Sequence, residues 1–223
     1  MILTFDDVLA ADSIAQIIRS VRPEDFVDGK RTAGWHAKLV KHNTQLAPSD
    51  ERTKALVVLV HDAIRKHDEF NRAFKTKALR APMISRYVPG MSYGAHVDDP
   101  FMGTSPMIRT DISMTLFLAD PASYEGGELV IESTFGVRSI KLRPGAMVVY
   151  PSTTLHRVAP VTAGVRLAAV SWAQCVIPDS FKREILYDLD NARRAIFAAQ
   201  GKTTEFDLIS KSYANLMRLW SDL

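Results

Sequence analysis

The chain lacks the marks of several protein classes. It has a single cysteine, Cys175, in 223 residues, which excludes an internal disulfide and favours a reducing compartment. No run of 18 consecutive apolar residues occurs, so we expect no membrane span and no membrane partner. The N-terminal segment carries Asp6 and Asp7 and has no basic start, which is atypical of a secretory signal. These absences predict a cytoplasmic protein.

The chain also has little excess charge of either sign. The chain has 28 basic and 25 acidic residues, so its net charge is only +3. No aromatic ladder or zinc-finger spacing accompanies the densest basic stretch, so we interpret it as a solvated loop and expect no nucleic-acid partner. That stretch contains Lys30, Arg31, Lys38, Lys41 and His42.

Hydrophobic spacing predicts helices before the middle of the chain. Residues 6–20 form a short amphipathic pattern. Its inward positions are Val8, Leu9, Ile14, Ile17 and Ile18. A second pattern begins after Pro48 and Ser49, with acidic residues in its first turn, where the helix dipole favours anions. Its apolar positions are Leu56, Leu59, Val60, Ala63 and Ile64.

The last part of the chain predicts a helical hairpin. Gly201 separates two apolar stripes at helical spacing. The first consists of Phe181, Ile185, Leu189, Ala192 and Ile196, and the second of Phe206, Ile209, Tyr213, Leu216 and Trp220. The hairpin must pack on the rest of the chain or on a second copy, so these C-terminal helices are a candidate homo-oligomer surface.

Between residues 82 and 175, short β-rich runs alternate with Gly- and Pro-containing turns. The runs are Met83–Val88, Ile112–Ala119, Glu128–Glu132, Gly136–Leu142, Ala146–Pro151, His156–Pro160 and Arg166–Gln174. Many short strands at regular spacing predict a sandwich or barrel. We therefore divide the chain into a mainly β domain with N-terminal helices, 1–176 with its β core at about 82–175, and a helical extension, 177–223.

Two of the six histidines have the surroundings of metal ligands. His96 and Asp98 point the same way if the backbone is extended, whereas Asp99 points to the other face. His156 begins another β run 60 residues after His96. Two imidazoles and one carboxylate leave three coordination positions open, which suits iron(II) oxygen chemistry. We expect no metal role for the other histidines, His36, His42, His61 and His67.

Arg166 lies ten residues after His156, on what we predict to be the next strand of a hairpin. Its neighbours are apolar, and a buried arginine is unfavourable unless it is paired. Its guanidinium could bind the distal carboxylate of a ligand chelated to the metal. The alternative is an internal ion pair with a protein carboxylate.

A longer pattern contains these residues. It reads Arg86-Tyr87-x-x-Gly90-x-x-Tyr93-x-x-His96-x-Asp98, then Gly126-Gly127-Glu128-Leu129, then His156 and Arg166. With this pattern the chain resembles the prolyl-hydroxylase-like branch of the iron(II)/2-oxoglutarate oxygenases. With its helical tail included, nearly the whole chain resembles the bacterial PKHD-type hydroxylases (the PiuC-like group).

The resemblance implies a mainly β fold, a double-stranded β-helix or distorted jelly roll, with flanking helices. It implies Fe(II) ligands at His96, Asp98 and His156. It further implies that Arg166 binds the C5 carboxylate of 2-oxoglutarate, assisted by a tyrosine such as Tyr87, with Tyr93 and Tyr150 as alternatives. The implied reaction hydroxylates a substrate C–H bond and releases succinate and carbon dioxide, with L-ascorbate as the expected reductant.

Some functions remain as rivals and others are set aside. Nucleic-acid demethylases of the superfamily carry Arg-x-Asn-x₅-Arg after the distal histidine, and the plant-type small-molecule enzymes carry Arg-x-Ser. This chain has neither, because Ala168 stands two residues after Arg166. A non-catalytic iron sensor or a zinc hydrolase is the rival, since two histidines and an aspartate also suit zinc. Neither needs Arg166.

The substrate stays open between a small molecule and a protein. The segment 99–110 contains Gly and two Pro, so we expect a loop beside the metal that is either a cover for the site or an ordinary connector. Arg109 and Asp111 either bind substrate or pair with each other.

Overall fold

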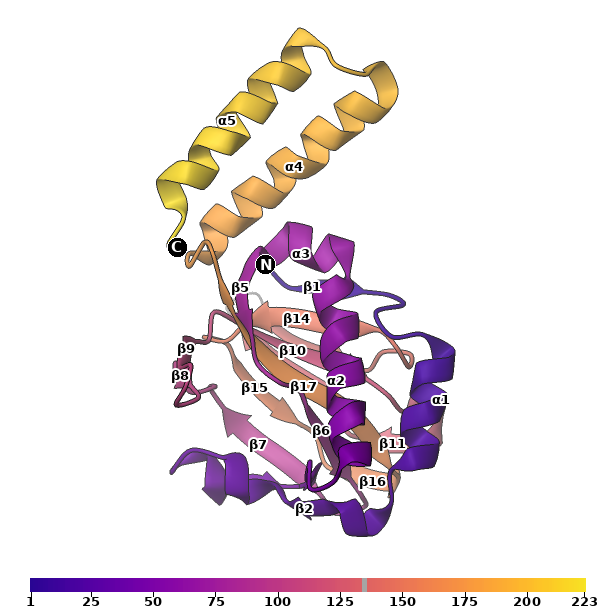
Figure 1. Ribbon diagram of the computed structural model, residues 1–223. Helices are drawn as coiled ribbons and strands as arrows, with labels where there is room; N and C mark the ends of the chain where they lie inside the picture. The colour runs from indigo at the N-terminus through magenta and orange to yellow at the C-terminus, as the bar shows by residue number, and fades with distance from the viewer. Residues whose placement is uncertain (134–135) are drawn as a thin grey trace.

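Two antiparallel sheets build the core of the molecule (Figure 1). The computed structural model describes residues 1–133 and 136–223. The larger sheet has eight strands, β1 (Leu3–Phe5), β14 (Met147–Pro151), β10 (Ile112–Phe117), β17 (Arg166–Cys175), β6 (Met83–Tyr87), β4 (Thr44–Leu46) and β2 (Phe26–Asp28) in that order, with β5 (Thr76–Leu79) also paired to β17. The smaller sheet has the order β13 (Gly136–Ile140), β12 (Leu129–Ser133), β15 (Leu155–Val158), β7 (Ser92–His96) and β3 (Lys41–His42).

Short ladders and helices complete the fold. The ladders are β11 (Tyr124–Gly126) with β16 (Val161–Gly164), and β8 (Phe101–Met102) with β9 (Ile108–Arg109). The α-helices are α1 (Ala11–Ser20), α2 (Glu51–Lys66), α3 (Asp68–Phe74), α4 (Ser180–Gln200) and α5 (Thr204–Trp220). Single 3₁₀ turns occur at Pro23–Asp25, Gly29–Thr32, Ala37–Leu39 and Pro121–Ser123. Across the described parts of the chain, no helix combines the length and hydropathy that a bilayer crossing needs.

Alternation along strand β10 supplies both faces of the larger sheet. Ile112, Met114 and Leu116 point to one face, where they pack with α1 and α2 in the main hydrophobic cluster. Phe117 points to the other face and joins a second cluster between the two sheets. Because both faces are covered, all six residues of β10 are buried. The prediction of a jelly roll with flanking helices is confirmed.

The predicted helix over residues 6–20 is wrong at residues 6–10. The segment before it, Leu3–Phe5, forms β1 and pairs with β14. Asp7 has a positive φ of 54°, which a continuous helix does not allow. The backbone N–H groups of Val8 and Leu9 donate to the carbonyl of Gly145, and the helix begins at Ala11. Ile18 is 51% exposed, so its predicted inward position is also wrong.

Several strands precede residue 82, where no strand is predicted from the sequence. They are β1 to β5, each only two to four residues long. Such short segments show too little alternation to be recognised, and their partners are distant strands. β4 pairs with β6 and β3 pairs with β7, so both sheets are extended by the N-terminal part of the chain.

The predicted C-terminal hairpin is present as α4 and α5 and projects from the β core beyond α3 (Figure 1). The α5 stripe faces α4, with Tyr213 buried at its centre. The predicted α4 stripe is wrong at Phe181 and Ile185, which are 78% and 47% exposed, whereas Leu189 packs in the cluster with Tyr213. Instead α4 buries Leu186 together with charged residues.

Asp190 is the charged residue on which the docking of α4 depends. It is 1% exposed. Arg193 and Arg194 donate to its carboxylate from the next turn of α4, and Arg72 reaches it from α3 at 3.5 Å. Burial raises the pKa of Asp190, but the hydrogen bonds from Arg193 and Arg194 outweigh that effect, so its pKa lies below the ordinary value.

We expect Asp190→Asn to destabilise the protein by about 1–3 kcal/mol, because three guanidinium groups lose the carboxylate that is their common anionic partner. Equilibrium urea unfolding gives the free energy of unfolding. Asp188→Asn is the matched control, because Asp188 is exposed on the same helix. Equal stability of the two variants would contradict the role assigned to Asp190.

Candidate metal centre

The first two side chains of the site come from neighbouring strands. In the smaller sheet β15 pairs with β7, and His156 is the direct cross-strand partner of His96. The two imidazole centroids are 4.3 Å apart, and the residues are 5% and 6% exposed. The strand register therefore places two imidazoles together inside the jelly roll, although 60 residues separate them in the chain.

The backbone fixes the orientation of both rings. Nδ1 of His96 lies 2.8 Å from the carbonyl oxygen of Gly94, and Nδ1 of His156 lies 3.0 Å from that of Thr154. A carbonyl oxygen only accepts, so Nδ1 carries the proton in each ring. Each Nε2 is then left with a free lone pair, which is the form of histidine that binds metals.

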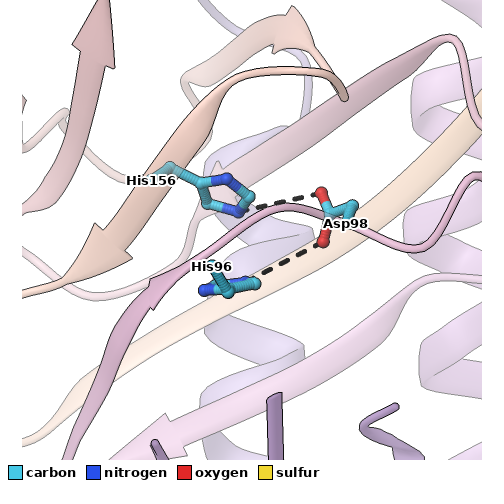
Figure 2. Close-up of side chains that lie close together, drawn as sticks. All are labelled: His96, Asp98 and His156. Carbon is cyan, nitrogen blue, oxygen red and sulfur yellow. Dashed lines mark ion pairs between the residues drawn. The ribbon is translucent and has the colours of Figure 1, made fainter. Parts of the chain in front are cut away.

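Asp98 completes the cluster (Figure 2). Its Oδ1 lies 3.9 Å from Nε2 of His96, and its Oδ2 lies 3.7 Å from Nε2 of His156. Ser113 on β10 donates a 2.5 Å hydrogen bond to Oδ2, which holds the carboxylate against the larger sheet. One ligand atom from each of the three residues lies within 4.8 Å of the others, so the cluster can hold a metal ion.

The neighbouring carboxylate, Asp99, is not part of the cluster, although it lines the same cavity. A Cβ atom placed on Gly34 would lie 2.8 Å from Oδ2 of Asp99, so this carboxylate packs against the segment around Gly34. Asp98 itself follows the end of β7 rather than lying within it. The opposite facing of the two aspartates, predicted from strand alternation, therefore stays a prediction.

Aromatic rings enclose the histidines. Tyr93 stacks on His96 with 3.7 Å between centroids, and Tyr150 contacts His156 edge-on at 5.0 Å. Burial, with His156 close by, holds the pKa of His96 below its ordinary value. His96 is therefore neutral at pH 7, as a metal ligand must be. Burial likewise raises the pKa of both tyrosines, so their hydroxyl groups stay protonated.

Arg166 lies in the opposite sheet from His156, so the predicted hairpin between them is wrong. The short strand β16 intervenes, and β15 and β17 belong to different sheets. β17 pairs with β6, which puts Arg166 directly across from Tyr87. The inward face of β17 brings the guanidinium into the space between the sheets, on the same cavity as the three clustered residues.

The guanidinium of Arg166 has no protein carboxylate as partner among the described residues. The residue is 1% exposed, and its Nε and Nη1 make no hydrogen bond to any part of the chain that the structure describes. It lies over the rings of Tyr87 at 5.0 Å and Phe117 at 5.6 Å. The alternative role for Arg166, an internal ion pair with a protein carboxylate, is therefore not found among the described residues. A buried cation with orphaned donors calls for an anionic ligand.

Gly127 makes room for this arginine. Its φ is +68°, and a Cβ atom there would lie 2.9 Å from Cδ of Arg166 and 3.1 Å from the ring of Tyr124. The glycine pair in the Gly126-Gly127 motif thus has a packing reason. Tyr124 also belongs to this region, although the sequence alone does not indicate it. Its buried hydroxyl group has no hydrogen-bond partner among the described residues and lies in the electric field of Arg166.

A cavity of about 420 Å³ contains the whole site. Its polar wall includes Tyr87, Tyr93, His96, Asp98, His156 and Arg166. It is also lined by Lys41 from β3, Gln45 from β4 and Asn43 between these strands. Lys41 is only 4% exposed, so the interpretation of Lys41 as part of a solvated basic loop is wrong. The signal missed in the sequence is the alternation of polar residues at 41, 43 and 45.

The segment 99–110 is more regular than predicted. It contains the β8–β9 hairpin, and Phe101, Met102 and Gly103 line the cavity. Arg109 and Asp111 pair with each other at 2.7 Å, which is one of the two alternatives left open by the sequence. Arg109 also contacts Asp222 at 3.0 Å, so this hairpin is tied to the C-terminal end of the chain.

Comparison with known families identifies the part of the chain that contains this site as an oxygenase domain. The model of the 2OG-Fe(II) oxygenase superfamily matches residues 82–174. The model of the PKHD-type hydroxylase C-terminal domain matches residues 181–222. The chain is 51% identical over 222 residues to a PKHD-type hydroxylase of Acaryochloris marina and 50% identical to one of Gloeothece citriformis, with 100% of each chain covered.

Solved structures share the fold at low identity. A prolyl hydroxylase from Trichoplax adhaerens, in complex with a hypoxia inducible factor peptide, has a TM-score of 0.60 and 15% identity, over 83% of this chain and 86% of that one. A viral collagen prolyl hydroxylase from Paramecium bursaria Chlorella virus-1, in complex with 2OG, has a TM-score of 0.53 and 18% identity, over 78% and 96%.

The geometry distinguishes the two adjacent aspartates. We expect Asp98→Ala to lower iron(II) affinity at least about a hundredfold, because it removes the one anionic group of the cluster. Asp99→Ala should leave iron binding unchanged. Iron content after anaerobic loading and desalting measures both. If Asp99→Ala loses iron and Asp98→Ala retains it, Asp98 is not the carboxylate ligand of the metal.

Proposed function

The chain belongs to the PKHD-type hydroxylases of the 2OG-Fe(II) oxygenase superfamily, and on that premise we propose its chemistry. It binds iron(II) through His96, Asp98 and His156 and takes 2-oxoglutarate as co-substrate. It hydroxylates a C–H bond of its substrate and releases succinate and carbon dioxide. When bound, iron(II) and 2-oxoglutarate supply the activation of dioxygen, and the protein supplies binding, orientation and a dry cavity.

The donor set fits iron(II). Two neutral imidazoles and a carboxylate leave three coordination positions free, enough for a chelating co-substrate and dioxygen. The hydrogen bonds from the Nδ1 atoms and from Ser113 hold the three ligands in place without any metal. The aromatic neighbours Tyr93 and Tyr150 pack against the two histidines and cover part of each ring.

Arg166 is the single observation that carries the proposal. Its unpaired, buried guanidinium lines the same cavity as the metal cluster. A dicarboxylic co-substrate that chelates the metal at one end presents a carboxylate at the other, and a guanidinium binds carboxylates with two parallel hydrogen bonds. Tyr87, directly across from Arg166, is the tyrosine best placed to assist. A zinc hydrolase or an iron sensor would give this arginine no role.

Ascorbate is the proposed reductant, since iron(II) must be kept reduced for repeated turnover. We propose a small molecule or a protein side chain as substrate. The proposed function can be tested without knowing the substrate, because enzymes of this chemistry can consume co-substrate slowly in its absence.

We expect the protein with iron(II), ascorbate and 2-oxoglutarate to release succinate without added substrate. Succinate is quantified by mass spectrometry against metal-free protein as control. Protein that has bound iron but gives no succinate above this control would support the iron-sensor alternative instead.

A second prediction concerns the clamp. Arg166→Ala should weaken 2-oxoglutarate binding by about 2–4 kcal/mol, or about 30- to 1,000-fold, because it leaves a buried carboxylate unpaired. Iron content should be retained. Calorimetric titration of the anaerobic iron(II) form measures the affinity. Arg138→Ala on strand β13 is the control, because Arg138 is exposed. Unchanged affinity in Arg166→Ala would remove Arg166 from the co-substrate site.

A further inference from the structure

A stripe of polar side chains enters the cavity from the N-terminal part of the chain. Lys41 on β3, Asn43 between the two strands and Gln45 on β4 are 4%, 3% and 4% exposed, whereas His42 is exposed. All three line the cavity. β3 is the edge strand of the smaller sheet and β4 belongs to the larger one, so the stripe crosses from one sheet to the other beside the metal cluster.

Lys41 is the only charged member of this stripe, and within the described residues it has no ion-pair partner. Its ammonium donates to Oγ1 of Thr32 at 3.1 Å and lies 5.1 Å from the centre of the Tyr93 ring. Two of its three N–H donors therefore remain free. Burial lowers the pKa of Lys41 to about 8, although Asp98 acts in the opposite direction. Such a group is stabilised by an anion brought in from outside.

The hydrogen bonds around Lys41 hold it ready for such a ligand. Thr32 donates to Oε1 of Gln45 at 2.5 Å and accepts from Lys41, so Lys41 and Gln45 are joined through one hydroxyl group. Oδ1 of Asn43 has no partner among the described residues, but it packs against Gly29, where an added Cβ atom would lie 1.9 Å from it. The stripe thus offers a fixed cation to the cavity, which suits a ligand with an anionic group.

We propose that Lys41 binds a carboxylate of the primary substrate, so that the substrate is a carboxylic acid or a molecule that carries an acidic side chain. Because it names a group of the substrate, this inference rests on the proposed function. Each cation then binds a different carboxylate, that of the substrate at Lys41 and that of the co-substrate at Arg166.

A carboxylate suits Lys41 better than a more highly charged group. One buried ammonium neutralises one negative charge, and the nearby charge of Asp98 disfavours a dianion such as a phosphate ester. The third cation on the cavity wall, Arg80, is half-buried and lies against Gly103 of the β8–β9 hairpin. It does not add to the charge at Lys41 by any contact within the described chain.

Chemical labelling of the full-length, metal-loaded protein tests the inference with acetate as the probe. Cyanate carbamylates neutral amines, and tandem mass spectrometry reports each lysine separately. At pH 8 we expect acetate to slow the labelling of Lys41 at least about fivefold, because pairing raises the pKa of an ammonium by roughly one unit and also covers it. Acetamide, the neutral isostere, should not protect. Lys38, exposed on the same segment, should label equally in all samples.

Three results would overturn the inference. They are a Lys41 that does not label, a Lys41 that acetamide protects as well as acetate, and a Lys41 that is fully protected by 2-oxoglutarate at the concentration that saturates its own binding. The last result would place Lys41 in the co-substrate site. The measurement is independent of turnover, so absence of succinate release would count against the proposed function and leave the labelling result to judge Lys41.

Discussion

The guanidinium of Arg166 is the constraint around which the inter-sheet cavity is organised. A full positive charge that is 1% exposed and has no carboxylate partner in the described chain would be expelled from most protein interiors. It persists because β17 is a central strand of the larger sheet and cannot shift without disrupting its pairing with β10 and β6. The rings of Tyr87 and Phe117 provide only partial compensation. This buried cation supports the proposal that the cavity binds an anion, independently of any metal.

The metal cluster is held by different elements but by the same principle of fixed strands. His96 and His156 are direct partners in the smaller sheet, and Ser113 of the larger sheet restrains Asp98. The two sheets thus each present one part of the chemistry, the imidazoles from one and the arginine from the other. Their separation is set by the cluster of buried side chains between them, which includes Phe117, Leu129 and Val148. Rigid sheets are a suitable support for a site whose parts must stay aligned.

The amino-acid sequence is sufficient to predict the features that depend on local alternation. The inward face of β10 follows from the period of a strand, and the same period singles out His96 and Asp98 as a pair, although β7 ends at His96. Features that depend on distant pairing are not accessible in this way, since nothing local indicates that β15 and β17 lie in different sheets. The same limit hides the strands before residue 82 and the burial of Lys41, whose partners lie far along the chain. On α4, apolar spacing indicates a partly wrong face, because this helix packs through the buried ion cluster at Asp190 as well as through apolar side chains.

We propose that one cavity binds iron(II) at the His96, Asp98 and His156 cluster and the far end of 2-oxoglutarate at Arg166. A crystal structure of the protein grown without oxygen in the presence of iron(II) and 2-oxoglutarate tests this most directly. We predict metal bonds to both Nε2 atoms and to the Asp98 carboxylate, with the distal carboxylate of the co-substrate on the Arg166 guanidinium. A metal bound elsewhere, or a co-substrate that leaves Arg166 without an anion, would contradict the proposal.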